Sequence, residues 1–312
     1  MQIVIVGAGG IGGYFGARLA AAGEPVAFLA RGRHAQALRE QGLRVTSALG
    51  DLHLREVAVA DDAAGLPPAD LVLFVVKLPD AEAAAAALPA LVRPGTVVLP
   101  LQNGVEVAEL LARRVGDDAV ALGAAYIAAH IAAPGVIAHG STFARLRFGA
   151  LRPGQPGVLR EFLAACRRAG VDAELADDIR RVVWEKFVFL VGLSGLTALT
   201  RLPIGATRAD PALRRLLRDV MSEAHALARA EGVALGDDFV ERQLAFVDTL
   251  PAGMKASMLH DLEAGRALEL PWLAAAVVRR SERAGLAAPA NRFVAAALGP
   301  YANGRPAGEA GG

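Results

Sequence analysis

Short apolar runs alternate with longer segments of mixed character in the N-terminal third of the chain. Runs of this length without polar alternation are typical of strands that are buried on both faces of a parallel sheet. Helical periodicity fills two of the intervening segments, Ile11–Ala22 and Asp80–Leu91. The pattern therefore predicts an α/β, doubly wound sheet covered by helices. Its expected strands are Ile3–Val6, Pro25–Leu29, Leu71–Val76 and Thr96–Leu99.

Other short segments of this half carry turn signals. Leu43–Ser47 and Leu52–Ala58 flank Gly50-Asp51, which predicts a hairpin-like insertion at an edge of the sheet. The segment Ala121–Gly149 has turn signals at Pro134-Gly135 and Gly140-Ser141, and we expect antiparallel strands there that complete the sheet. A helix over Val158–Ala169 and a strand near Val171–Leu175 would then end this half.

After Asp178 the pattern becomes helical. We predict helices over Ile179–Leu199, Pro211–Glu231, Asp237–Val247 and Leu273–Ala284. Residues 1–177 are thus expected to form an α/β domain and residues 178–300 an all-α domain. Residues 301–312 are expected to be a flexible tail, because Asn303–Gly312 is rich in Gly, Ala and Pro and has no apolar face.

Composition narrows the class of protein. The chain has 312 residues, 54% hydrophobic and 21% charged, with a formal net charge of +1, which predicts a folded protein without a nucleic-acid footprint. No apolar run reaches the roughly 18 residues of a membrane span, and no signal peptide is recognised, so we expect a cytoplasmic protein without a membrane partner. The single cysteine, Cys166, is expected to be a buried thiol, and the histidines have no metal-ligand spacing.

A glycine-rich motif, Gly7-Ala8-Gly9-Gly10-Ile11-Gly12, joins the first strand to the first helix. In this order of elements Gly7 permits a tight turn, Gly9 lets the backbone approach a pyrophosphate, and Gly12 lets the helix pack closely on the strand. The helix N-terminus then points its free N–H groups at the phosphates. We predict a dinucleotide site that includes Gly10 and Ile11; the alternative is an ordinary strand–turn–helix corner.

The segment after the second strand bears on which dinucleotide binds. A site for NAD usually has an acidic residue there to hold the ribose 2′-hydroxyl. This chain has Ala30-Arg31-Gly32-Arg33 instead, and a guanidinium group can hold a 2′-phosphate with paired hydrogen bonds. The sequence therefore favours NADP(H), with two solvated loop arginines as the alternative interpretation.

Three further segments carry candidate chemistry: Leu99–Gly104 at a strand end, Trp184-Glu185-Lys186, and Ser257–Asp261 followed by Glu269. Lys186 lies in an otherwise apolar helical segment, and burial would lower the pKa of its amine toward neutrality, where it could serve as an acid. The alternative is a surface lysine whose stem lies along apolar neighbours.

The ordered set GAGGIG, LQNG, WEK and SMLHD followed by Glu269 resembles the ketopantoate reductase (2-dehydropantoate 2-reductase) family from Met1 to about Ala297. The resemblance implies an NADPH-binding, Rossmann-type domain joined to a helical domain. It implies that Lys186 is the catalytic lysine, Glu269 the active-site glutamate and Ser257 a substrate-binding serine. It also implies that Asn103 lies near nicotinamide and substrate, and that Lys77 and Arg31 bind the cofactor.

The chain departs from the family pattern in its expected substrate pocket. Two asparagines that contact substrate are replaced by Leu190 and Ser194, of which only Ser194 can donate a hydrogen bond. After Glu269 the family often has Asp and Asn, where this chain has Leu270-Pro271-Trp272. We therefore expect NADPH-dependent reduction of ketopantoate to pantoate, as in pantothenate biosynthesis. The alternatives are reduction of another, more apolar 2-oxo acid and a non-catalytic NADP-binding sensor. The family also allows a homodimer.

Overall fold

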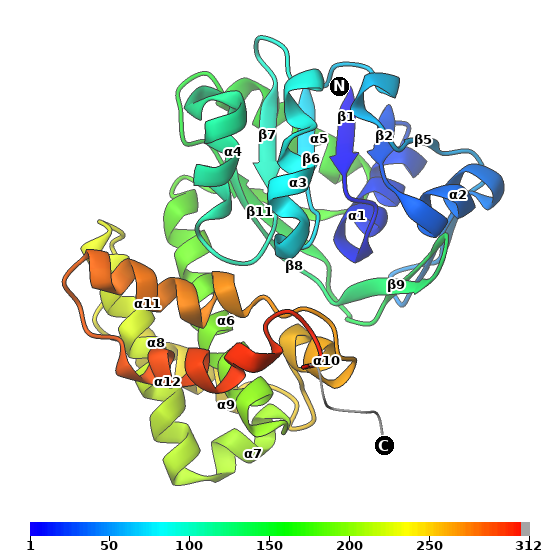
Figure 1. The fold of residues 1–312 in the computed structure, drawn as a ribbon. Helices are drawn as coiled ribbons and strands as arrows, with labels where there is room; N and C mark the ends of the chain where they lie inside the picture. The colour runs from blue at the N-terminus through cyan, green and yellow to red at the C-terminus, as the bar shows by residue number, and fades with distance from the viewer. Residues whose placement is uncertain (307–312) are drawn as a thin grey trace. The chain divides into compact units, whose positions relative to one another are not determined.

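The computed structural model describes residues 1–306, and these residues form two compact units. The first, here called the α/β unit, contains residues 1–102 and 106–182 (Figure 1). The second, the helical unit, contains residues 103–105 together with the chain from residue 183 onward. Each unit has its own hydrophobic core.

The α/β unit is built on a five-stranded sheet whose order is β5-β2-β1-β6-β7. All neighbouring strands are parallel, and each residue of β1 is buried. Counted along the chain, the strands stand in the order 3-2-1-4-5, which is the order of a doubly wound nucleotide-binding sheet. The predicted sheet is therefore confirmed. Its strands are β1 (Ile3–Val6), β2 (Val26–Leu29), β5 (Ala58–Ala60), β6 (Leu71–Phe74) and β7 (Val97–Pro100).

The helices of this unit differ from the prediction at three places. The helix expected over Asp80–Leu91 is only the short α3, because Pro89 lacks the N–H that an interior helical position must donate, and a 3₁₀ turn forms at Leu88–Ala90 instead. Two helices were not predicted from the sequence: α2, which begins directly after Arg31, and α4. The helices are α1 (Gly10–Ala21), α2 (Gly32–Gln41), α3 (Ala81–Ala85), α4 (Val107–Val115) and α5 (Pro156–Arg168).

The remaining strands do not complete the central sheet as expected, although one parallel bridge, Val98 with Val120, joins β7 to the residues just before β8. They form a four-stranded sheet, β4-β3-β10-β9, and a three-stranded sheet, β12-β11-β8. The predicted hairpin of β3 with β4 is confirmed, although β4 ends at Leu54 rather than Ala58. The bounds are β3 (Leu43–Ser47), β4 (Leu52–Leu54), β8 (Leu122–Tyr126), β9 (Ala129–Ala133), β10 (Val136–His139), β11 (Arg145–Gly149) and β12 (Asp172–Leu175).

Helix α1 explains why the four-stranded sheet is separate, because it packs between that sheet and the central one. On one side, a Cβ at Gly16 would lie 2.6 Å from the Phe28 ring on β2. On the other side, a Cβ at Gly10 would lie 2.2 Å from the Ala129 carbonyl of β9, and one at Gly13 would lie 2.7 Å from Ile137 of β10. Glycines on both faces of α1 thus allow two sheets to pack on one helix.

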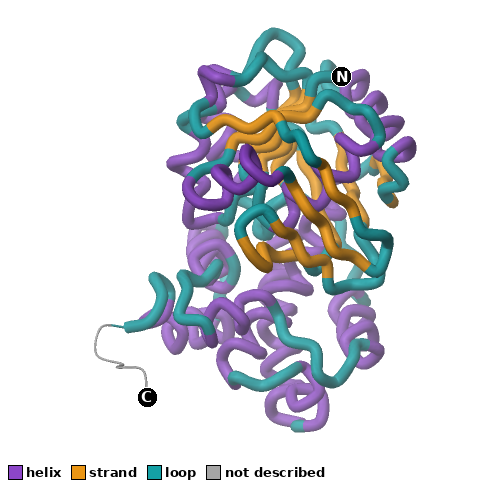
Figure 2. The backbone as a smooth tube through the Cα atoms, turned by 90° about the vertical axis from the view of Figure 1, so that its right-hand side faces the viewer, coloured by secondary structure: helices purple, strands orange, loops and turns teal. Residues whose placement is uncertain are grey.

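The helical unit confirms the predicted all-α C-terminal region, and Figure 2 draws it in helix and loop colours only. Three of its helices, α7, α10 and α12, were not predicted. Helix α6 is long and apolar enough to span a membrane, but 72% of that window is buried, as in the core helix of a globular unit. The helices are α6 (Ile179–Thr200), α7 (Ile204–Ala209), α8 (Pro211–Ala230), α9 (Phe239–Thr249), α10 (Ser257–Glu263), α11 (Ala274–Arg283) and α12 (Pro289–Leu298).

The predicted domain limits, 1–177 and 178–300, stay a prediction. The compact units divide within α6, between residues 182 and 183, and residues 103–105 belong to the helical unit. Of the expected tail, residues 307–312 lie outside the described residues, and Gly299–Tyr301 forms a 3₁₀ turn.

Candidate active site

The glycine-rich loop has two glycines that the backbone requires and one that faces open space. Gly7 has φ +106°, and a Cβ there would lie 2.9 Å from the backbone N of Val76. A Cβ at Gly12 would lie 2.0 Å from the Gly7 carbonyl oxygen. By contrast, nothing lies within 4 Å of a Cβ at Gly9, which caps α1. The loop therefore leaves open room beside a helix N-terminus, which fits a pyrophosphate.

The other two residues predicted in this loop have different surroundings. Gly10 packs against the backbone of β9 at Ala129, so its missing side chain serves packing between α1 and the four-stranded sheet. Ile11 is half-buried in the first turn of α1, where there is no acidic side chain to repel a phosphate. A cofactor contact of Gly10 or Ile11 stays a prediction.

Cationic side chains lie at the same edge of the sheet. Arg31 is exposed and caps α2, directly after β2, and Arg33 lies in the first turn of that helix. Lys77 is exposed and caps a 3₁₀ turn after β6. Because the strand order is β2-β1-β6-β7, this edge presents the arginines, then the glycine loop, then Lys77. That succession suits the 2′-phosphate and pyrophosphate of NADP.

His34 links two segments at this edge, although no sequence motif marks it as a site residue. Its Nε2 lies 2.8 Å from the Ala8 carbonyl in the glycine loop, and the Gly135 N–H donates to its Nδ1 at 3.1 Å. These partners fit the neutral imidazole with its proton on Nε2, and burial lowers the pKa of His34, which favours that form. The ring thus fastens α2 to the glycine loop. No spacing rule could reveal partners so distant in sequence.

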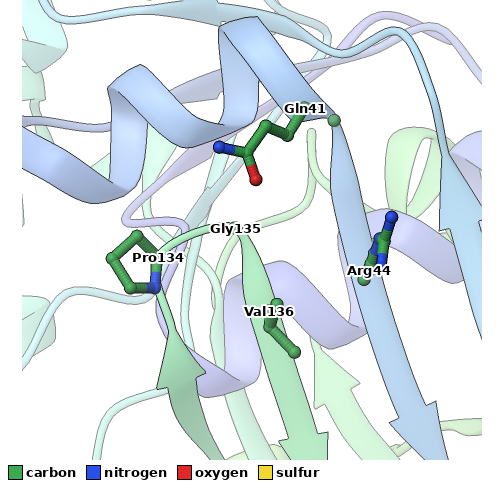
Figure 3. Close-up of a pocket in the computed structure, with 6 residues that line it drawn as sticks. Gln41, Arg44, Pro134, Gly135 and Val136 are labelled. Atoms are coloured by element: carbon green, nitrogen blue, oxygen red, sulfur yellow. The ribbon is translucent and has the colours of Figure 1, made fainter.

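A small cavity of about 100 Å³ lies beside Gly135, between the end of α2, the start of β3 and the β9–β10 turn (Figure 3). Its lining includes Gln41, Arg44 and Pro134 but none of the predicted site residues. Ligand pockets usually have volumes of about 300–1,000 Å³, so this cavity is too small for a dinucleotide.

The helical unit brings three of the predicted site residues together. Asn103 donates a hydrogen bond from Nδ2 to Oε2 of Glu269 over 3.0 Å, although 166 residues separate them. The next residue, Gly104, has φ +96°, and a Cβ there would lie 3.1 Å from the Trp272 carbonyl oxygen. The Asn103-Gly104 turn therefore fits closely against the segment that carries Glu269.

Lys186, the third residue, lies on α6 among apolar side chains. Trp184 and Phe187 beside it are buried and pack edge to face, with ring centroids 5.3 Å apart. Burial lowers the pKa of the Lys186 amine from 10.5 to about 8, and the Glu269 carboxylate acts in the opposite direction by stabilising the charge. This environment differs from that of the exposed lysine in the alternative interpretation.

The predicted substrate-binding residues Ser194 and Ser257 also lie in the helical unit, together with Leu190. Ser194 is buried on α6, and Leu190, between it and Lys186, is half-buried. Their spacing of four and eight residues from Lys186 places them on one face of the helix. Ser257 is exposed as the first residue of α10. Their contact with a substrate stays a prediction.

The remaining titratable candidates are structural. Cys166 is buried in α5, and burial raises the pKa of its thiol to about 12, so it is unsuited to act as a nucleophile. His139 is buried between Ser47, Ser141 and the Tyr14 ring. Within residues 1–306, no cluster of three or more His, Cys, Asp or Glu side chains could hold a metal ion.

Comparison with known families gives matches over both units. Residues 3–153 match the family described as Ketopantoate reductase PanE/ApbA, and residues 178–302 match the family described as Ketopantoate reductase PanE/ApbA C terminal. A 2-dehydropantoate 2-reductase of Halobacterium salinarum is 33% identical over 296 residues, which cover 95% of this chain and 97% of that protein.

Solved structures agree with these matches. The crystal structure of 2-dehydropantoate 2-reductase from Geobacter metallireducens is 35% identical, with a TM-score of 0.88 over 96% of this chain and 99% of that one. The ternary structure of D-mandelate dehydrogenase with NADH and anilino(oxo)acetate also has a TM-score of 0.88, and at 19% identity it shows the shared fold alone.

Proposed function

The chain belongs to the ketopantoate reductase family, and from this premise we propose that it reduces 2-dehydropantoate to pantoate with NADPH, as in pantothenate biosynthesis. The observation that carries the proposal is the group of Lys186, Glu269 and Asn103. It supplies an amine of lowered pKa, a carboxylate that stabilises its charge, and an amide that fixes the carboxylate.

The α/β unit would hold the cofactor. The open face at Gly9 and the N-terminus of α1 would bind the pyrophosphate, Arg31 the 2′-phosphate, and Lys77 a further polar group of the dinucleotide. When bound, NADPH supplies the hydride that reduces the keto carbon.

Lys186 would supply the proton and the positive charge that the reaction needs. At neutral pH its amine is mostly protonated, and the ammonium group stabilises the oxyanion that develops on the keto oxygen before protonating it. Its lowered pKa makes that transfer easier than it would be from an ordinary lysine. The Glu269 carboxylate would stabilise the charge of the ammonium group, and the hydrogen bond from Asn103 would keep that carboxylate oriented.

Leu190 favours a second candidate substrate, a more apolar 2-oxo acid. It lies on the Lys186 face of α6 where the family pattern has an asparagine, so one polar contact to ketopantoate is absent from that face. Loss of a hydrogen-bonding group can change substrate discrimination strongly. A non-catalytic NADP sensor is disfavoured, because Lys186 and Glu269 are both retained.

The experiment is NADPH oxidation by the purified full chain, with ketopantoate and a longer-chain 2-oxo acid compared. Lys186→Ala should lower kcat by roughly 100-fold or more while the Kd for NADPH stays unchanged, since general acid catalysis contributes about 10²–10⁴-fold. Lys186→Arg is the matched variant, because it keeps the charge but releases no proton near neutral pH. Wild-type activity in either variant would exclude Lys186 as the acid, and absence of turnover with both acids would refute the proposed substrate class.

We also propose that the protein is a cytoplasmic homodimer and that the small 2-oxo acid is its substrate. Light scattering on the purified chain tests the oligomeric state: a mass twice that of the 32.3 kDa chain is expected, and a monomeric mass would contradict the proposal.

A further inference from the structure

Gln102, the last residue before the chain first leaves the α/β unit, has a buried amide without partners. The residue is 8% exposed, and among the described residues neither its Oε1 nor its Nε2 has a hydrogen-bond partner. Buried polar side chains are nearly always hydrogen-bonded, because leaving the group unpaired destabilises the fold. Single polar atoms of other buried side chains, such as Thr207 Oγ1 and Ser281 Oγ, also lack a partner, but among the described residues Gln102 alone has two such atoms, and a polar ligand would give partners to both.

A second buried glutamine in the same unit shows the ordinary arrangement. Gln155 is 1% exposed, and its Oε1 accepts from the N–H groups of Leu151 and Arg152 at 2.7 and 3.1 Å. Its Nε2 donates to the carbonyls of Asp118 and Val120 at 2.9 and 2.8 Å. Both glutamines are buried side chains of one type, but only Gln155 satisfies its amide within the protein.

The position of Gln102 relates it to the proposed cofactor site. It follows β7, where the Leu101 N–H donates to the Phe74 carbonyl at the end of β6. It therefore stands at the carboxyl edge of the sheet, two strands from the glycine loop after β1. With neighbouring strands about 4.8 Å apart, the lateral separation is about 10 Å. Arg31 lies on the opposite side of the loop, after β2.

We propose that Gln102 is a cofactor-binding residue whose side-chain amide hydrogen-bonds the nicotinamide–ribose half of the dinucleotide. The proposal rests on the proposed cofactor site. If the pyrophosphate lies at Gly9 and the 2′-phosphate at Arg31, the dinucleotide continues toward β6 and β7. An amide both donates and accepts, and so do the carboxamide and the ribose hydroxyls of that half. Both amide atoms are shielded from solvent, so the proposal includes a rotation of the Gln102 side chain toward the edge when the cofactor binds.

The test measures cofactor binding and stability of the full-length Gln102→Met variant, which keeps the length of the side chain but removes the amide. The Kd for NADPH should rise by about threefold to tenfold, the range expected for one lost neutral hydrogen bond. The Kd for 2′,5′-ADP, which contains the 2′-phosphate but no nicotinamide, should not change. The Tm of the cofactor-free protein should stay the same or rise, because no internal hydrogen bond is lost.

Gln155→Met is the matched control. It should lower the Tm, because four hydrogen-bond partners lose their glutamine, and it should leave the NADPH Kd of the folded protein unchanged. The proposal is overturned if Gln102→Met lowers the Tm without cofactor, weakens 2′,5′-ADP as much as NADPH, or leaves NADPH binding unaffected. These measurements contain no 2-oxo acid, so failure of the proposed substrate is a separate outcome.

Discussion

Raising the pH through 8 should switch off the reduction, because it removes the proton from Lys186. The amine has a pKa of about 8 in the folded protein. With that pKa about nine-tenths of the molecules are protonated at pH 7 and about one-tenth at pH 9. An acid must be protonated to act, so activity is present below the pKa and is lost above it, by about tenfold for each further pH unit.

The assay is kcat/KM for ketopantoate from pH 6 to pH 10, with the Kd for NADPH measured at both ends as a control for cofactor binding. An ordinary lysine of pKa about 10.4 would remain mostly protonated at pH 9 and give no loss there. Glu269→Gln removes the carboxylate that stabilises the ammonium form, so the alkaline limb should move to lower pH. A profile that stays flat to pH 10, or a limb that Glu269→Gln leaves in place, would refute the reasoning.

Three further predictions concern the cofactor loop and the substrate face. Arg31→Ala should raise the KM for NADPH more than that for NADH, by about tenfold or more for a lost charged contact, and equal changes would remove Arg31 from the 2′-phosphate site. Leu190→Asn should improve kcat/KM for ketopantoate by a few-fold to roughly tenfold, and an unchanged value would show that this face does not contact the substrate. Gly9→Ala should weaken NADPH binding at an unchanged Tm, whereas Gly12→Ala should lower the Tm because its Cβ would lie 2.0 Å from the Gly7 carbonyl oxygen. Calorimetry measures the Tm of each variant and titration its Kd for NADPH. A lower Tm for Gly9→Ala would contradict the open space beside Gly9.

The elements with strong local signals were predictable. Their conformation depends on nearby residues, so the sequence pattern predicts them directly. Examples are the strand Ile3–Val6, the turn at Gly7 and the long apolar helix α6. Helix α2 was missed because its segment begins with glycine and contains few large apolar residues. The separate four-stranded sheet was missed because it depends on α1 packing between two sheets, which no strand pattern records.

The candidate site was predictable in its members but not in its arrangement. The motifs pointed to Asn103, Lys186 and Glu269, yet the hydrogen bond between Asn103 and Glu269 joins segments that are far apart in the chain. The lowered pKa of Lys186 depends on tertiary burial. Gln102 lies in the LQNG motif, but no role for it was predicted, because only the fold reveals that its amide has no partner.

The short segment 103–105 has a consequence for how this chain can be divided or recombined. It belongs to the helical unit although the residues on both sides of it, up to 102 and from 106, belong to the α/β unit. The backbone therefore passes between the units three times, and a cut near residue 182 does not yield two complete modules. Consider a chimera that takes residues 183 onward from one parent protein and residues 1–182 from another. It would inherit Glu269 and Asn103 from different parents unless residues 103–105 are exchanged as well. Any exchange of the helical unit between proteins therefore has to include residues 103–105.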